Sequence, residues 1–142
     1  FIYFLFKQIF FGDIIFANGL CSNQAQAYEA EDIVVGSFAF ENGVLGTGNW
    51  CFTSSKSAEK DEIVIDGSKG QIKVETFGKG EFTVIKDGKE PYHYQVDLPK
   101  HIQQPLIESI VSQLLGKGSC PSTGITASKA NWAMDQLTSK KI

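Results

Sequence analysis

The sequence predicts an α+β domain, in which an open-faced, mostly antiparallel sheet of about six strands carries helices on one face. Short apolar segments separated by turn residues follow one another from residue 13 to about residue 98, as in consecutive antiparallel strands. After Pro99 the apolar residues recur at helical spacing instead. The strands therefore precede the helices rather than alternate with them, unlike the order of a doubly wound α/β fold.

The first eleven residues are almost entirely apolar. A membrane-spanning helix needs about 20 such residues, and a signal peptide needs a basic start and a cleavage site of small residues. Residues 1–11 meet neither requirement, because the run ends at Gly12 and Asp13. We expect them to form a buried helix, and we expect the chain to continue upstream of it in the complete protein.

The clearest strand pair spans residues 32–41 and 44–53, with residues 14–22 as a further candidate strand before it. Asn42 and Gly43 lie between the paired segments. Asn-Gly is a strong hairpin signal, because a type I′ turn needs positive φ at both central residues. The sequence thus predicts a β-hairpin with a type I′ turn over residues 32–53.

Two further hairpins follow along the chain. Each consists of two short apolar segments around a turn that contains glycine: residues 62–65 with 71–75, and residues 81–85 with 92–96. Consecutive hairpins build an antiparallel sheet, since neighbouring strands in the chain usually pair.

Two helices complete the chain, over residues 102–115 and from residue 125 to about residue 139. The apolar residues of the first lie on one stripe: Ile102, Leu106, Ile110 and Leu114. Those of the second lie on a narrower side: Ala130, Ala133, Met134 and Leu137. Glycine, serine and proline dominate residues 116–124 between them, so this segment is predicted to be a loop.

The composition is that of an ordinary globular domain, with 42% hydrophobic and 20% charged residues. We expect residues 1–142 to form a single domain. The net charge is −3 and the lysines are scattered among acidic residues, which argues against a nucleic-acid partner. Cys21, Cys51 and Cys120 are far apart, so no disulfide framework or zinc site is indicated, and a cytoplasmic location without membrane association is expected.

No motif points to a catalytic, cofactor-binding or metal-binding residue. Gly46 and Gly48 begin like a dinucleotide fingerprint, but Cys51 replaces its third glycine and no helix follows to hold a pyrophosphate. His93 and His101 have no acidic cluster nearby in sequence, so neither a metal site nor a catalytic dyad is expected.

Aromatic residues of the first hairpin recur with one parity: Phe38, Phe40, Trp50 and Phe52. Side chains of the same parity point to one face of a strand. Two interpretations stay open at this point. The face packs into the core, or it meets a second subunit, because an exposed aromatic patch usually marks an interface.

Several segments in a fixed order carry a likeness to a known family: Tyr-Glu-Ala-Glu-Asp at residues 28–32, then residues 40–46, residues 65–72 and the closing helix pair. Together they resemble, over essentially the whole chain, the C-terminal domain of the glucose-fructose oxidoreductase and inositol dehydrogenase (Gfo/Idh/MocA) superfamily. The resemblance implies that the helix-covered face looks toward a nucleotide-binding domain and that the open face packs against a second subunit, giving a homodimer.

Complete relatives, the resemblance implies, transfer a hydride between NAD(P) and a hydroxyl of a sugar, inositol or related polyol. Their glycine-rich turn and catalytic lysine lie upstream, in an N-terminal Rossmann domain that this chain lacks. The resemblance also implies an Asp and a His near the domain junction, at or before the first helix. Residues 1–11 contain neither Asp nor His, so no catalytic residue is carried over. The chain alone is therefore expected to bind neither NAD(P) nor a metal, and to be inactive.

The sequence thus favours a substrate-side and oligomerisation domain of an NAD(P)-dependent oxidoreductase. The candidates for substrate lining lie at the end of the first hairpin and in the loop after it: Trp50, Thr53, Ser54, Ser55 and Lys56. An ordinary solvent loop is the alternative there. For the whole chain, the alternatives are a free-standing protein-interaction module and a carrier of a small ligand.

Overall fold

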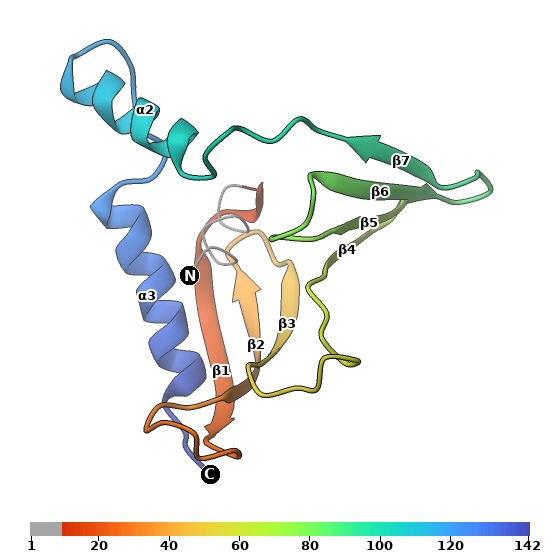
Figure 1. Cartoon of the computed structure of the whole chain (residues 1–142), viewed down its shortest axis with the longest axis vertical. Helices are drawn as coiled ribbons and strands as arrows, with labels where there is room; N and C mark the ends of the chain where they lie inside the picture. The colour runs from red at the N-terminus through yellow and green to blue at the C-terminus, as the bar shows by residue number, and fades with distance from the viewer. Residues whose placement is uncertain (1–9) are drawn as a thin grey trace. The chain divides into compact units, whose positions relative to one another are not determined.

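The computed structural model describes residues 10–142, so the helix predicted over residues 1–11 lies almost wholly outside the described part. The described residues form seven strands and two helices (Figure 1). They divide into two compact units, one formed by the residues up to Lys56 together with Pro121–Ile142, the other by Ser57–Cys120. The fold is α+β, as predicted.

The first unit contains a three-stranded antiparallel sheet. Its strands are β1 (Ile14–Ser22), β2 (Ile33–Phe40) and β3 (Leu45–Cys51), in the order β1-β2-β3. The hairpin predicted over residues 32–53 is confirmed, with Phe38 opposite Gly46 and Val34 opposite Trp50.

The turn of this hairpin differs from the predicted type I′. The Gly43 amide donates to the Phe40 carbonyl oxygen, and Gly43 has φ 85° while Asn42 has no positive φ. This is the longer class of hairpin, in which a type I turn is followed by a left-handed glycine. The turn signal was correct, but Asn-Gly occupies a position one residue later in the turn than predicted.

Helix α3 (Gly124–Thr138) covers one face of this sheet and runs alongside β1 in Figure 1. Its N-terminus carries a capping box, in which Thr123 Oγ1 accepts from the Thr126 amide and Thr126 Oγ1 accepts from the Thr123 amide. The predicted apolar side of the helix is confirmed, since Ala130, Ala133 and Leu137 are buried. The core joins them to Ile14, Ala17, Cys21, Val34, Phe38 and Phe40 of the sheet.

A buried aspartate organises the connection between β1 and β2. Asp32 is fully buried, and its carboxylate accepts hydrogen bonds from the amides of Gln24 and Ala25, at 2.9 and 2.7 Å. A buried carboxylate is stable only when such donors satisfy it. Asp32 therefore holds the loop after β1 in place.

The second unit contains a four-stranded antiparallel sheet and one helix. Its strands, in sheet order, are β4 (Ile63–Gly67), β5 (Gly70–Val74), β6 (Glu81–Lys86) and β7 (Tyr92–Gln95). The two predicted hairpins are thus confirmed. Helix α2 (Gln104–Leu114) follows, and Gly116, in the left-handed region with φ 68°, lies just beyond its end.

The prediction of one sheet of about six strands is wrong. The described residues form one sheet of three strands and one of four, because β3 and β4 do not pair with each other. Alternation and turn residues identify each hairpin, but they carry no information on whether two hairpins share an edge. Within residues 10–142 neither helix is long and apolar enough to cross a membrane.

Candidate functional site

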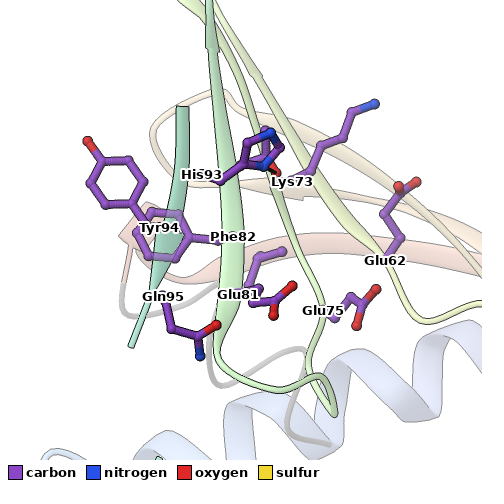
Figure 2. A pocket seen from close by; sticks show the side chains of 10 residues that line it. Glu62, Lys73, Glu75, Glu81, Phe82, His93, Tyr94 and Gln95 are labelled. Carbon is purple, nitrogen blue, oxygen red and sulfur yellow. Dashed lines mark hydrogen bonds between the residues drawn. The ribbon is translucent and has the colours of Figure 1, made fainter. Parts of the chain in front are cut away.

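A polar hollow of about 520 Å3 lies on the four-stranded sheet of the second unit (Figure 2). All four strands, or the residues that adjoin them, contribute to it. Its lining is mostly hydrogen-bonding side chains, with an aromatic edge: Glu62, Lys73, Glu75, Glu81, Thr83, His93 and Gln95, then Val74, Phe82 and Tyr94.

The strand register explains why three glutamates meet at one end of the hollow. Val74 lies opposite both Ile63 on β4 and Phe82 on β6. The residues that adjoin these partners, Glu62, Glu75 and Glu81, are therefore brought to the same end of the sheet. Figure 2 shows Glu75 and Glu81 side by side there, with Gln95 of β7, the register partner of Glu81, next to them.

A second row of polar side chains crosses the middle of the sheet. Lys73 lies opposite Thr83, and Thr83 lies opposite His93. The Thr83 hydroxyl and His93 Nδ1 are hydrogen-bonded at 3.0 Å. Since Thr83 occupies Nδ1, the imidazole presents Nε2 as its second hydrogen-bonding atom.

Charge in the hollow is predominantly negative. Lys60 Nζ lies 2.7 Å from Glu62 Oε1, and this hydrogen bond is the main reason why the pKa of Glu62 lies below its ordinary value. Partial burial opposes the effect, and the charges of Lys60 and Lys73 add to it. Like charges in neighbouring strand positions repel each other. The packing of the sheet therefore does not explain why the three glutamates lie in one row.

The described residues contain no group of three or more His, Cys, Asp or Glu side chains placed to hold a metal ion. The hollow instead offers carboxylates that accept hydrogen bonds, an ammonium that donates them, and an amide and an imidazole that can do both. A hydroxyl both donates and accepts, so a small ligand rich in hydroxyl groups is chemically suited to this lining.

The residues predicted to line a substrate site belong to the first unit, whereas the hollow is formed by residues of the second. Trp50 is the last residue but one of β3 and packs against the core of the first unit. Thr53, Ser54, Ser55 and Lys56 follow it in an exposed loop, where the Thr53 hydroxyl lies 3.8 Å from the thiol of Cys51. The structure brings these residues together as one segment, and their contact with substrate stays a prediction.

The aromatic face predicted as a possible dimer surface is largely a core surface. Phe38 and Phe40 are each only 2% exposed, and Trp50 packs against the same core. The parity prediction was correct, but this is the face that α3 covers. Only Phe52, which follows β3, is strongly exposed.

The opposite face of the three-stranded sheet, called the open face below, is the one that α3 does not cover. Its exposed apolar residues were not singled out from the sequence: Phe16, Leu20, Val35 and Leu45. The sequence does show that Val35 of β2 and Leu45 of β3 point away from Phe38 and Trp50, because their positions have the opposite parity. The sequence does not show which of the two faces the helix covers.

A second hollow, of about 460 Å3, lies in the first unit between the start of β1 and the middle of α3. Asp13 and Lys129 form an ion pair there, beside Trp132. Both charged groups are thereby engaged with each other, so this hollow offers a ligand fewer polar partners than the first.

The known proteins that this chain resembles are described as oxidoreductases. No protein-family model matches the chain. Oxidoreductase P35 of Formosa agariphila is 34% identical over 128 residues, which are 89% of this chain and 37% of the relative. The chain thus spans little more than a third of the curated relative it matches, and that relative is an oxidoreductase.

Two solved structures share the fold. An oxidoreductase from Agrobacterium radiobacter, solved in complex with NAD+, L-tartaric acid and magnesium, has a TM-score of 0.73 at 14% identity, over 91% of this chain and 41% of its own. A protein from Thermotoga maritima classed as an oxidoreductase has a TM-score of 0.69 at 18% identity, over 95% of this chain and 42% of its own. The chain therefore has a fold found in part of larger oxidoreductases.

Proposed function

We propose that this chain is the C-terminal, substrate-side and oligomerisation domain of an NAD(P)-dependent oxidoreductase of the Gfo/Idh/MocA superfamily. The observation that carries the proposal is the match to Oxidoreductase P35, which takes in 89% of this chain but only 37% of the relative. The order of hairpins and closing helices and the shared fold with larger oxidoreductases support it.

The cofactor belongs to the part of the parent protein outside this chain, because the glycines here do not fit a dinucleotide. Gly46 and Gly48 lie inside strand β3, with no helix after it. Both have packing reasons to be glycine. A Cβ on Gly46 would come within 2.2 Å of the Phe38 ring, and one on Gly48 within 2.1 Å of the Trp50 ring. No reaction step is therefore assigned to NAD(P) on this chain.

The polar hollow is the proposed point of contact with a polyol. Sugars and inositols present adjacent hydroxyl groups, each of which can donate to a carboxylate and accept from an ammonium or amide. Glu75 and Glu81 supply the acceptors, and Lys73 and Gln95 supply the donors. Such sites derive selectivity from a few placed polar groups. The chain's own role is to bind and orient the substrate, and hydride transfer requires the complete protein.

Self-association through the open face of the three-stranded sheet is the second part of the proposal. Strands β1, β2 and β3 contain no charged residue, and their open face exposes the apolar side chains of Phe16, Leu20, Val35 and Leu45. Exposed apolar surface of this kind favours an interface.

The polar residues of this face suit a second copy of the same chain. Asn18 lies opposite Ser37, and Ser37 lies opposite Thr47, so the three form one row across the sheet. Each of these side chains both donates and accepts hydrogen bonds. Such a row complements itself across a two-fold axis, which is what a symmetric dimer requires.

The same uncharged face also favours one alternative, a free-standing interaction module that binds another protein. The two functions separate on the parent polypeptide. Under the proposal, the complete gene product contains a nucleotide-binding region and reduces NAD+ or NADP+ in the presence of a polyol such as myo-inositol, whereas this chain does not. A complete product that lacks such a region and binds an unrelated protein through β1–β3 would support the alternative.

A further inference from the structure

The chain contains two Asn-Gly pairs, and the structure places them in opposite environments. Of its five asparagines, only Asn18 and Asn42 precede a glycine. An asparagine loses its side-chain amide most readily before glycine, because glycine has no Cβ to hinder attack of its backbone nitrogen on the asparagine side chain. The two pairs therefore offer one chemistry in two places within a single fold.

Asn42 and Gly43 occupy the exposed tip of the β2–β3 hairpin. Asn42 is exposed, and a Cβ built on Gly43 would meet nothing within 4 Å, so the backbone around Gly43 has room to move. A hydrogen bond of 2.9 Å, from the Gly43 amide to the Phe40 carbonyl oxygen, restrains the nitrogen that would attack. This restraint is weak, because an exposed turn opens locally at a low cost in free energy.

The side chain of Asn42 is held beside that nitrogen and is polarised for attack. The Val44 amide donates to Asn42 Oδ1 at 3.1 Å. Since Oδ1 reaches past Gly43 to the next amide, the side-chain carbonyl group of Asn42 lies alongside the Gly43 peptide. Attack of the Gly43 nitrogen on Asn42 Cγ develops negative charge on Oδ1, and a donor already in place stabilises that charge. The turn thus supports the reaction.

Asn18 and Gly19 lie in the middle of strand β1, where the same reaction is hindered. Gly19 is the register partner of Gly36, and a Cβ on Gly19 would come within 2.5 Å of the Leu137 carbonyl oxygen of α3. The backbone at Gly19 is therefore enclosed between the neighbouring strand and α3. Ring closure would require the Gly19 nitrogen to leave the strand geometry, and opening a core strand costs far more free energy than opening a turn.

We propose that Asn42 is a site of spontaneous deamidation and isoaspartate formation in the folded chain, whereas Asn18 is protected. The Gly43 nitrogen gives up its proton to solvent base and forms a bond to Asn42 Cγ. The bond from Cγ to the side-chain nitrogen breaks, and that nitrogen takes up a proton and leaves as ammonia. Water then adds to either carbonyl group of the resulting succinimide ring, giving aspartate or isoaspartate. The proposal is independent of the function proposed above.

Isoaspartate would loosen the hairpin tip. It places one extra carbon in the backbone before Gly43, so the two hydrogen bonds that close the turn cannot both keep their geometry. These bonds run from the Gly43 amide to the Phe40 carbonyl oxygen and from the Phe40 amide to the Val44 carbonyl oxygen. The new carboxylate also adds a second negative charge beside Glu41. The paired parts of β2 and β3 lie beyond these bonds, so the core should stay intact.

Peptide mapping by mass spectrometry, after incubation of the folded chain at mildly alkaline pH, tests the proposal. Chymotrypsin releases the two sites on separate peptides, residues 17–20 and 41–45, because a phenylalanine precedes each segment and a leucine ends it. Deamidation raises the mass of a peptide by one dalton. Asn42 should react at least about tenfold faster than Asn18, because only Asn42 reacts without opening the core. Equal rates, or faster reaction at Asn18, overturn the proposal.

The unfolded chain is the control for effects of sequence alone. In urea the two sites should react at similar rates, since each is then an Asn-Gly pair in a flexible chain. Folding should change the rate at Asn42 by less than about threefold and should slow Asn18 by at least about 30-fold. If folding slows Asn42 as much as Asn18, the turn protects its amide and the proposal is wrong.

Two matched variants identify the source of the mass change. Asn42→Gln keeps an amide at the tip but requires a larger ring that forms more slowly, so the mass gain in residues 41–45 should disappear. Asn18→Gln makes the same change in β1 and should leave the rate at Asn42 unaltered. A gain of one dalton in residues 41–45 of Asn42→Gln, at the wild-type rate, would contradict the assignment to Asn42.

Discussion

Leu137 of helix α3 lies directly over Gly36 of strand β2. A Cβ built on Gly36 would come within 2.2 Å of Leu137 Cδ2, closer than any real contact. Gly19 on the neighbouring strand, the register partner of Gly36, approaches the backbone of Leu137 in the same way. The two glycines therefore let the helix pack tightly against the sheet, and this contact closes the core of the first unit.

Gly36→Ala is accordingly expected to destabilise the chain. Forcing a methyl group into a packed core costs about 1 to 3 kcal/mol, and urea unfolding followed by circular dichroism would measure it. Gly124→Ala is the matched control, since a Cβ there meets nothing within 4 Å. That control should be neutral or slightly stabilising, because alanine favours a helix. Equal stability of Gly36→Ala and the wild type would show that α3 does not pack here as described.

A polyol should bind at the hollow between Lys73 and Gln95. NMR titration with myo-inositol is expected to shift the amide signals of β5, β6 and β7. Thr83→Val removes the hydroxyl that orients His93, and the loss of one hydrogen bond should raise the dissociation constant about three- to tenfold. Thr53→Val is the matched control in the loop after β3. If Thr53→Val weakens binding and Thr83→Val does not, substrate contacts the loop, not the hollow.

The ionisation of Glu62 should depend on Lys60. The pKa of Glu62 is lowered chiefly by the Lys60 hydrogen bond, so the folded state releases this proton more readily than the unfolded state. The resulting stabilisation is present above the unfolded pKa and is lost as pH falls through the folded pKa.

Lys60→Ala should therefore raise the pH midpoint of the Glu62 side-chain carboxyl signal toward its ordinary value, and Lys60→Arg should largely preserve it. High salt should shift the wild-type midpoint in the same direction as Lys60→Ala, because exposed charges are screened. A midpoint that does not change in Lys60→Ala contradicts the assigned cause.

Self-association should depend on the open face of β1–β3. The wild-type chain is expected to be a dimer by multi-angle light scattering at high micromolar concentration. Val35→Lys buries an unpaired charge in the proposed interface and should weaken dimerisation by about 100-fold or more. Val64→Lys, on the other sheet, makes the same change outside that interface and should leave the dimer intact. A monomeric wild type would rule out the proposed dimer.

The elements of the fold were largely predictable because their signals are local. Turn glycines and alternating apolar residues identified all three hairpins, and helical spacing identified α2 and α3. Which side chains share a face of the sheet was also predictable, as the common orientation of Phe38 and Trp50 shows. Which face α3 would cover was not, since both faces of β1 and β2 carry apolar side chains.

The division into two sheets and the polar hollow depend on contacts that sequence spacing does not encode. Glu62 and Glu81 approach each other only through the registers of β4 with β5 and of β5 with β6. His93 was assigned to a strand and given no site role, because its partner Thr83 lies ten residues away across a hairpin. The buried role of Asp32 likewise depends on a loop that folds back onto it.

Titration of the purified chain with NAD(H) and NADP(H), followed by calorimetry and nicotinamide fluorescence, tests whether the cofactor site lies outside this chain. If the nucleotide-binding region lies outside this chain, as proposed, the chain should not bind either cofactor at millimolar concentration. Saturable binding at micromolar concentration would contradict the proposal and would place a cofactor site among the residues of this chain.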